Sequence, residues 1–169
     1  MSSNYSIGVF GGTFDPIHYG HLRAAYEILY ALNLNEIRFI PCGDPYHRDQ
    51  VFADADVRLK MVSTAIKKQK NFLIDDREVR KKKPSYSIDT LISLREDFRN
   101  NSICLIIGMD VFLSLHKWHR WTEILNFAHI IIAHRPGWSL PNFGKLGDLI
   151  KNKGTNNIKD LLCKSFILL

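Results

Sequence analysis

Apolar and polar residues alternate along the chain in a way that predicts strands and helices in turn. Short segments rich in apolar residues indicate strands at 7–10, 36–41, 72–74, 103–107 and 130–133, and the last two are unbroken runs with branched side chains, as in strands buried on both faces. Between them, apolar residues recur every three or four positions, which is the spacing of one face of a helix. This spacing predicts helices at 22–32, 59–66 and 88–95. The succession favours an α/β fold with one doubly wound parallel sheet and helices on both faces.

Turn and capping residues mark where several of these elements begin and end. Gly11-Gly12 follows the first strand at once, as expected for a tight turn. Asn33 can close the first helix, Asp54 or Asp56 can cap the second, and Ser87 precedes the third. Ligands of such sheets bind beyond the carboxyl ends of the strands, so we expect a ligand at the Gly11-Gly12 turn.

Length and composition bound the class of protein. The 169 residues, 46% of them hydrophobic, suit a single domain spanning 1–169. The longest apolar runs are far shorter than the roughly 18 to 20 residues that a membrane span requires, so we expect no membrane partner. The N-terminus lacks the basic and apolar segments of a secretory signal, which favours a cytoplasmic protein. Cys42, Cys104 and Cys163 are widely spaced and odd in number, which favours isolated thiols.

The positive charge of the chain suits an anionic partner without identifying it. The 23 Lys and Arg residues exceed the 17 Asp and Glu residues, which gives a formal net charge of +6. The densest basic cluster, at 77–83, lacks the interleaved aromatic residues of nucleic-acid modules. We therefore predict a solvated loop at 77–83 and no nucleic-acid partner.

The stretch from Gly11 to His21 combines residue types suited to holding a polyphosphate. Adjacent glycines let the backbone approach a phosphate closely, and the start of the following helix offers unpaired N–H donors and a favourable dipole. Thr13 can add a hydroxyl. Because His18 and His21 are three residues apart on the first helical turn, both can donate hydrogen bonds to one polyphosphate, and Gly20 leaves room beside them.

Each of these features taken singly has a simpler explanation. Two glycines can serve a plain strand-to-helix turn, and two histidines can be a surface pair or half of a zinc site. A zinc site needs a third protein ligand, and no other His, Cys or Asp stands at a persuasive spacing. The combination in one string of eleven residues therefore favours phosphate binding, with no protein metal ligand.

This string resembles the signature of the nucleotidyltransferase superfamily, whose H-x-G-H element occurs in looser form in class I aminoacyl-tRNA synthetases. Four later segments resemble motifs of bacterial nicotinate-nucleotide adenylyltransferases, in order and at similar spacing: 84–91, 106–110, Trp118 and 134–137. The loop 45–48 resembles a basic loop of that family, with Tyr46 where the family often has proline. The resemblance covers nearly the whole chain. It implies a Rossmann-like fold and transfer of the adenylyl group of ATP to nicotinate mononucleotide.

The resemblance also implies roles for individual residues. On the ATP side it gives His18 and His21 to catalysis and the following residues to nucleotide binding: Gly11, Gly12, Thr13, Phe14, Gly108 and Asp110, the last on the ribose. On the nicotinate mononucleotide side it implies contacts with His47, Arg48, Ser85, Tyr86, Ser87, Trp118, His119 and Arg135. Trp118 would face the pyridine ring, backbone N–H groups near Ser87 and His119 would hold its carboxylate, and basic groups including Arg135 would hold its phosphate. Without the resemblance, packing, a helix cap or a solvated loop explains Trp118, Trp121, Tyr86, Asp110 and Arg135 equally well.

Two further expectations concern the metal and the end of the chain. Because the sequence has no clustered carboxylate site, we expect Mg²⁺ to travel with the ATP phosphates. The resembling family continues to a [Ser/Thr]-x-Ile-Arg motif at a helix N-terminus, which this sequence lacks. Residues 164–169 predict the sixth strand that would lead into that helix. We therefore expect a chain that lacks its C-terminal ATP-binding helix.

Other functions remain open at this point. A phosphopantetheine adenylyltransferase shares the first motif and the fold, but it is not expected to show the segments 84–91 and 134–137. A catalytically weak nucleotide-binding module is supported by the missing arginine motif. An RNA-binding or tRNA-acting domain rests on the charge and the H-x-G-H element alone. The sequence predicts neither the oligomeric state nor the choice between acid and amide pyridine nucleotides.

Overall fold

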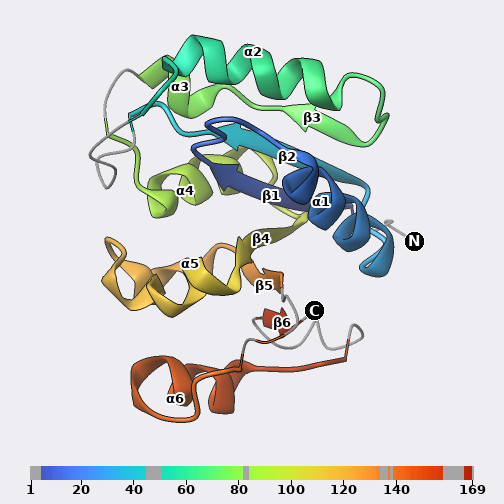
Figure 1. Ribbon diagram of the computed structural model, residues 1–169. Helices are drawn as coiled ribbons and strands as arrows, with labels where there is room; N and C mark the ends of the chain where they lie inside the picture. Colours follow the sequence, from blue (N-terminus) through green and yellow to red (C-terminus); the bar gives the residue numbers. More distant parts are fainter. Residues whose placement is uncertain are drawn as a thin grey trace.

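A parallel sheet of six strands forms the centre of the molecule (Figure 1). The computed structural model describes residues 5–44, 51–81, 84–133, 137 and 139–157, and the backbone of 166–168. The strands lie in the order β3-β2-β1-β4-β5-β6. Their bounds are Ser6–Gly12 (β1), Glu36–Pro41 (β2), Phe72–Ile74 (β3), Ser102–Gly108 (β4), His129–Ala133 (β5) and Phe166–Leu168 (β6). All six predicted strands, including the short last one, are confirmed.

The helices include the three that the apolar spacing predicts and several that it does not. Their bounds are Tyr19–Ala31 (α1), Ala55–Ile66 (α2), Arg77–Lys81 (α3), Ser87–Asp97 (α4), Met109–Leu113 (α5) and Gly144–Lys153 (α6). Two 3₁₀ helices, Leu115–Lys117 (η1) and Trp121–Asn126 (η2), follow α5. Asp54 is the N-cap of α2 as predicted, but its side chain makes no capping hydrogen bond.

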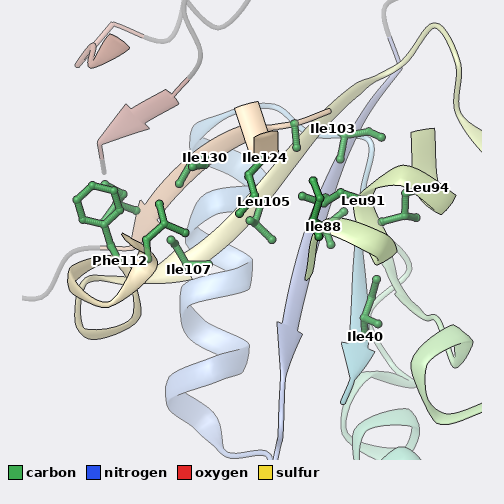
Figure 2. Packing of buried hydrophobic residues seen from close by; sticks show 14 of the residues in the cluster. Ile40, Ile88, Leu91, Leu94, Ile103, Leu105, Ile107, Phe112, Ile124 and Ile130 are labelled. Atoms are coloured by element: carbon green, nitrogen blue, oxygen red, sulfur yellow. The ribbon is translucent and has the colours of Figure 1, made fainter. Parts of the chain in front are cut away.

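Successive side chains of the buried strands point to opposite faces of the sheet, and each face has its own core. On one face, residues of α4 such as Ile88 and Leu91 and residues of β4 such as Leu105 and Ile107 belong to one buried cluster (Figure 2). On the other face, α1 and α2 cover a second cluster that includes Phe39. Helices therefore cover both faces, which confirms the doubly wound architecture.

The sheet opens between its two central strands at their carboxyl ends. β1 pairs with β2 as far as Gly12, and β4 pairs with β5 as far as Gly108. Within the described part of the chain, the pairing of β1 with β4 ends at Val9 and Leu105, three residues before either strand ends. The strand order also reverses direction at this pair, and such a switch point is where open α/β sheets bind ligands.

The basic cluster after β3 is not the solvated loop that its charge predicted. Arg77–Lys81 forms helix α3, and the half-buried guanidinium of Arg77 donates hydrogen bonds to Asp75, Ser93 and Asp97. The loop prediction failed because it considered the cations without the carboxylates on either side of them in the fold. Lys82 and Lys83 lie outside the described residues.

No helix in the described ranges is both long enough and apolar enough to cross a membrane.

Candidate active site

The end of β1 places two glycines, and the loop after it a strained phenylalanine, at the opening between β1 and β4. Gly11 and Gly12 still pair with β2, so the prediction that they form the turn after the strand is wrong and the turn begins at Thr13. A Cβ atom on Gly11 would have no neighbour nearer than a backbone oxygen at 4.0 Å, so other atoms can approach this backbone closely. A Cβ on Gly12 would lie 3.2 Å from the ring of Phe14, which folds back beneath it. Phe14 has a φ of 50°, a left-handed conformation that is rare for a bulky residue. Such strain is characteristic of functional loops.

His18 and His21 cap the start of α1 with their own side chains. His18 is the N-cap, and its Nδ1 accepts a hydrogen bond from the backbone N–H of Gly20 at 3.1 Å. The Nδ1 of His21 accepts one from the backbone N–H of His18 at 3.3 Å. Two of the N–H groups that the sequence left unpaired at this helix start are therefore taken by the histidines. This corrects the expectation that these backbone donors themselves face the ligand.

The same two hydrogen bonds fix which nitrogen of each histidine carries the proton. A neutral imidazole has one N–H, so a ring whose Nδ1 accepts a hydrogen bond carries its proton on Nε2. The two rings are stacked, with centroids 3.8 Å apart and planes 26° apart. The stacking places the two rings side by side, and donation by both Nε2–H groups to one polyphosphate stays a prediction.

An aromatic group behind the pair holds the His21 ring. The edge-to-face contact of His21 with Phe14 has centroids 5.2 Å apart, and the one with Phe10 has centroids 6.1 Å apart. Both phenylalanines are buried and also pack on Phe39 of β2. The orientation of His21 is therefore set by the core of the sheet and not by solvent.

Gly108 and Asp110 lie at the end of β4, across the opening from Gly12. A Cβ on Gly108 would lie 2.5 Å from Oδ1 of Asp110, so the carboxylate folds over the glycine in space that a side chain would fill. Asp110 itself is exposed at the start of α5. Gly12 and Gly108 are the last paired residues of β1 and β4, so both lie at the carboxyl edge of the parallel sheet. The structure thus brings the predicted ATP-side residues to one edge.

The start of α4 and the loop between η1 and η2 meet through Tyr86 and His119. Their ring centroids are 4.4 Å apart and their planes differ by 35°. Arg120, with a φ of 50°, adds a longer contact of 4.0 Å to Asp89 on α4. Ser87 begins α4, and the side chain of its N-cap, Tyr86, does not cap the helix. An anion would be favoured at this helix start, where the backbone N–H groups point outward along the axis.

Of the other residues predicted to contact nicotinate mononucleotide, the structure describes some and leaves others outside its described ranges. Ser85 is buried just before α4, and Trp118 is half-buried, packing in part against the core of Figure 2. A parallel bridge between Asp44 and Pro84 brings the segment after β2 next to the segment that carries Ser85. The following predicted residues lie outside the described ranges: His47, Arg48 and Arg135.

Arg58 is a buried residue next to the candidate site that the sequence reasoning missed. It is 1% exposed on α2, and its guanidinium donates to backbone carbonyls in the loops after β1 and after β2. One signal for it was present in the sequence. Arg58, Val62 and Ile66 follow one another at intervals of four, so the arginine stands on the buried stripe of its helix.

The thiols and the buried carboxyl near the site do not offer a nucleophile or a strong base. Burial raises the pKa of Cys42 to about 12, and burial likewise raises the pKa of Cys104 to about 12. Both thiols therefore stay protonated at neutral pH. Burial raises the pKa of Glu78, which accepts a hydrogen bond from the Thr90 hydroxyl at 2.6 Å. The two thiols are therefore not nucleophiles at neutral pH.

The described residues include no group of three or more His, Cys, Asp or Glu side chains that could hold a metal ion. The exposed carboxylate of Asp110 and the hydroxyl of Thr13 are single oxygen donors, which suit at most one position of an ion held mainly by another molecule.

Comparison with known proteins identifies the family. Residues 9–164 match the model of the cytidylyltransferase-like family. A protein of Aeromonas hydrophila named "Probable nicotinate-nucleotide adenylyltransferase" is 42% identical over 155 residues, which cover 92% of this chain and 72% of that protein. One of the same name from Hydrogenovibrio crunogenus is 42% identical over 160 residues, covering 95% of this chain and 77% of that protein.

The fold agrees with these relatives. The structure of Plasmodium falciparum nicotinic acid mononucleotide adenylyltransferase complexed with NaAD matches with a TM-score of 0.75. The match covers 98% of this chain and 74% of that one, at 18% sequence identity. The family match and the relatives each cover nearly the whole chain, and the sheet opens between β1 and β4, where such folds bind ligands. The chain therefore belongs to the cytidylyltransferase-like family and, within it, to the nicotinate-nucleotide adenylyltransferases.

Proposed function

We propose that this protein transfers the adenylyl group of ATP to the 5′-phosphate of nicotinate mononucleotide, giving nicotinate adenine dinucleotide and pyrophosphate. The observation that carries the proposal is the stacked histidine pair, held by its Nδ1 atoms beside the opening between β1 and β4. The named relatives supply the choice of substrates.

The reaction requires little chemistry from the protein. The attacking 5′-phosphate has a second pKa of about 6, so it is already largely ionised at neutral pH. One oxygen of this phosphate forms a bond to the α-phosphorus of ATP while the bond to the pyrophosphate oxygen breaks. The main barriers are the approach of two anions, their in-line alignment and the charge that develops on the leaving oxygens. The absence of a strong base among the described site residues is compatible with this mechanism.

The histidine pair and the glycine loop lower these barriers. The Nε2–H groups of His18 and His21 donate to oxygens of the ATP phosphates, where negative charge grows during transfer. Gly11 and Gly12 let the backbone approach those phosphates, and Thr13 and Phe14 complete the loop. Because the histidines are anchored before the substrate arrives, little reorganisation is needed at the transition state.

The two nucleosides lie on either side of the histidine pair. Gly108 and Asp110 bind the adenosine, with the Asp110 carboxylate accepting hydrogen bonds from ribose hydroxyls. The pyridine ring lies against Trp118, and its carboxylate accepts from backbone N–H groups near Ser87 and His119. Three arguments support this placement of the pyridine ring and its carboxylate. The side chain of Tyr86, the N-cap of α4, makes no capping hydrogen bond, and the ring of Tyr86 contacts that of His119. In addition, a carboxylate is favoured at a helix N-terminus. Ser85 and Tyr86 contact the rest of the mononucleotide, and the family resemblance adds the basic residues His47, Arg48 and Arg135, which lie outside the described residues.

A divalent cation fits this site as part of the substrate. Carried by the ATP phosphates, Mg²⁺ would add positive charge on the same oxygens that the histidines contact, and no cage of protein ligands is needed for it.

Release of pyrophosphate tests the proposal. In a form of the protein that also carries a [Ser/Thr]-x-Ile-Arg segment after residue 169, we expect turnover with ATP, Mg²⁺ and nicotinate mononucleotide, and slower or no turnover when nicotinamide mononucleotide or phosphopantetheine replaces the acid. Calorimetric titration with nicotinate mononucleotide alone gives a second readout that does not depend on ATP. Equal or better turnover of phosphopantetheine would overturn the proposal.

A further inference from the structure

Arg58 carries a buried charge that meets only backbone oxygens. Its guanidinium donates hydrogen bonds to the carbonyls of Ala53 at 2.9 Å, Thr13 at 2.7 Å, Cys42 at 2.7 Å and Gly43 at 3.0 Å. None of the ion pairs in the described part of the chain involves it. An arginine that is 1% exposed is costly to bury, so four well-placed acceptors are needed to hold it.

These four carbonyls belong to segments that are far apart in the sequence. Thr13 follows β1, Cys42 and Gly43 follow β2, and Ala53 precedes α2. One side chain therefore fastens the loop after β1 to the loop after β2. A second hydrogen bond joins the same two loops, because the backbone N–H of Phe52 donates to Oδ2 of Asp15 at 2.6 Å.

The direction of each carbonyl also fixes the direction of an N–H group. In a trans peptide unit the C=O and the following N–H point opposite ways. Since the Thr13 carbonyl points at Arg58, the N–H of Phe14 points away from it, and Phe14 is the residue with the φ of 50°. The carbonyls of Cys42 and Gly43 likewise turn the N–H groups of Gly43 and Asp44 away from the guanidinium.

We infer that Arg58 is a positioning residue for adenylyl transfer, which holds the loop after β1 and the loop after β2 in one fixed relation. The first loop joins the two glycines that end β1 to the histidine pair, and the second leads into the segment next to Ser85. Arg58 thus couples the ATP side of the site to the mononucleotide side without touching either substrate. The inference rests on the proposed function.

Kinetics of two substitutions on one helix test this role. Arg58→Lys keeps the charge, but a single ammonium cannot replace the planar fork that reaches four carbonyls. We expect its kcat/KM to fall about 10²-fold, the scale of a displacement of about 1 Å in an active site, with KM raised for both nucleotides. Ile66→Ala is the matched control, because Ile66 is buried on the same stripe of α2 at its far end. It should lower the melting temperature at least as much and leave both KM values unchanged.

Amide hydrogen exchange gives a readout that does not need turnover. Exchange at Phe14, Gly43 and Asp44 should quicken in Arg58→Lys and stay at the wild-type rate in Ile66→Ala. If Arg58→Met also folds, it should show a larger loss than Arg58→Lys. Arg58→Lys with the kinetics and exchange rates of Ile66→Ala would overturn the inference. A wild-type chain without turnover would instead contradict the proposed function, and the exchange comparison would still decide on Arg58.

Discussion

Two regions of this molecule concentrate positively charged or hydrogen-donating side chains, and they do so in opposite ways. One is the site, where His18, His21 and Arg58 gather at the carboxyl ends of β1 and β2. The other is a charged hollow of about 500 Å³ beside β3. The hollow is lined by Arg38, Ile74, Asp75, Asp76, Arg77, Arg80, Ser93 and Asp97.

In the hollow, each arginine pairs with a carboxylate. Arg77 lies 2.8 Å from Asp75 and 2.9 Å from Asp97, and Arg80 lies 2.7 Å from Asp76. An incoming anion would have to displace these carboxylates. At the site, by contrast, Arg58 is held by neutral carbonyls and the histidine Nδ1 atoms by backbone N–H groups. A dense cluster of positive residues in the sequence is thus a poor guide to anion binding. A better guide is the positive charge that remains after each cation has been paired with neighbouring carboxylates.

The largest effect should come from removing one histidine. His18→Ala or His21→Ala each loses a preorganised Nε2–H donor to a polyphosphate whose charge grows toward the transition state. We expect kcat to fall about 10²- to 10³-fold, or roughly 2.7 to 4 kcal/mol, with a smaller change in nicotinate mononucleotide affinity. Steady-state kinetics and titration of the mononucleotide measure the two quantities. Near-wild-type kcat in both variants would mean that the histidines only cap α1.

In the hollow, the corresponding substitution should affect stability and not catalysis. Arg77→Met removes charged hydrogen bonds to Asp75 and Asp97 and leaves the buried Asp75 with less compensation. Hydrogen bonds to charged groups contribute about 1.5 to 3 kcal/mol, so the free energy of unfolding should drop by about that amount. Urea denaturation gives the loss, and kcat should stay within a factor of two. A tenfold rise in KM for ATP would show that the hollow binds nucleotide after all.

A similar loss in binding energy, confined to one substrate, should follow replacement of Trp118. Stacking of a base on an aromatic ring contributes roughly 1 to 3 kcal/mol, so Trp118→Ala should weaken nicotinate mononucleotide binding about 5- to 150-fold. ATP affinity should hardly change, and Trp118→Phe should recover much of the loss because it restores an aromatic face.

The core contacts of Trp118 allow a competing outcome. The half-buried indole packs partly against the cluster of Figure 2, so some stability should be lost with it. A fully buried tryptophan costs about 3 to 5 kcal/mol when truncated to alanine. A drop of that size in the unfolding free energy with unchanged mononucleotide affinity would assign Trp118 to the core alone.

The difference between the regions also explains what the sequence could predict. The sheet, the helices α1, α2 and α4 and the connection from β1 to α1 were predictable, because apolar periodicity and turn residues act over a few neighbouring positions. The roles of Arg58 and Arg77 were not predicted, because each depends on acceptors that the fold brings from elsewhere. The five-residue α3 carries too few apolar positions for a helical period to be visible.

The contact between Tyr86 and His119 shows the same limit. The two residues are more than thirty positions apart, and neither has a local pattern that points to the other. Only the resemblance to a family placed both on one side of the site. The periodicity could predict the layers, while the pairing of loops at the sheet edge required the three-dimensional structure.

A smaller effect concerns pH, and the two regions should show opposite signs. Burial raises the pKa of Glu78 above its ordinary value of 4.5, so the folded state holds this proton more tightly than the unfolded chain does. The contribution of Glu78 to stability is therefore full below about pH 4.5 and is lost as the pH rises through the folded pKa. Glu78→Gln should remove this decline.

Asp75 in the hollow should behave in the reverse manner. Burial alone would raise the pKa of Asp75, but the hydrogen bonds and charge of Arg77 outweigh burial and lower it below its ordinary value of 3.8. Its contribution to stability is present above pH 3.8 and is lost as the pH falls through the folded pKa. Unfolding free energies measured from pH 3 to 8 for wild type, Glu78→Gln and Asp75→Asn separate the two. If the contributions of Glu78 and Asp75 to the unfolding free energy changed with pH in the same direction, the predicted difference between the two regions would be wrong.

The smallest effect should come from Arg80, and it tests the contrast at its weakest point. The Arg80 side chain is 77% exposed, and its ion pair with Asp76 joins positions four apart at the surface. Exposed pairs of this kind contribute about 0.3 to 0.5 kcal/mol and are screened by salt. Arg80→Ala should therefore change the unfolding free energy by no more than about 0.5 kcal/mol. The KM of this variant for ATP should also equal that of the wild type at both 50 mM and 500 mM salt. Of the lining arginines, Arg80 is the one that an anion could recruit with least disruption, since only this exposed pair would have to open. The contrary outcome is a KM for ATP that rises severalfold in Arg80→Ala at low salt and returns to the wild-type value at high salt. It would mean that the hollow attracts nucleotide electrostatically even though its arginines are paired with carboxylates.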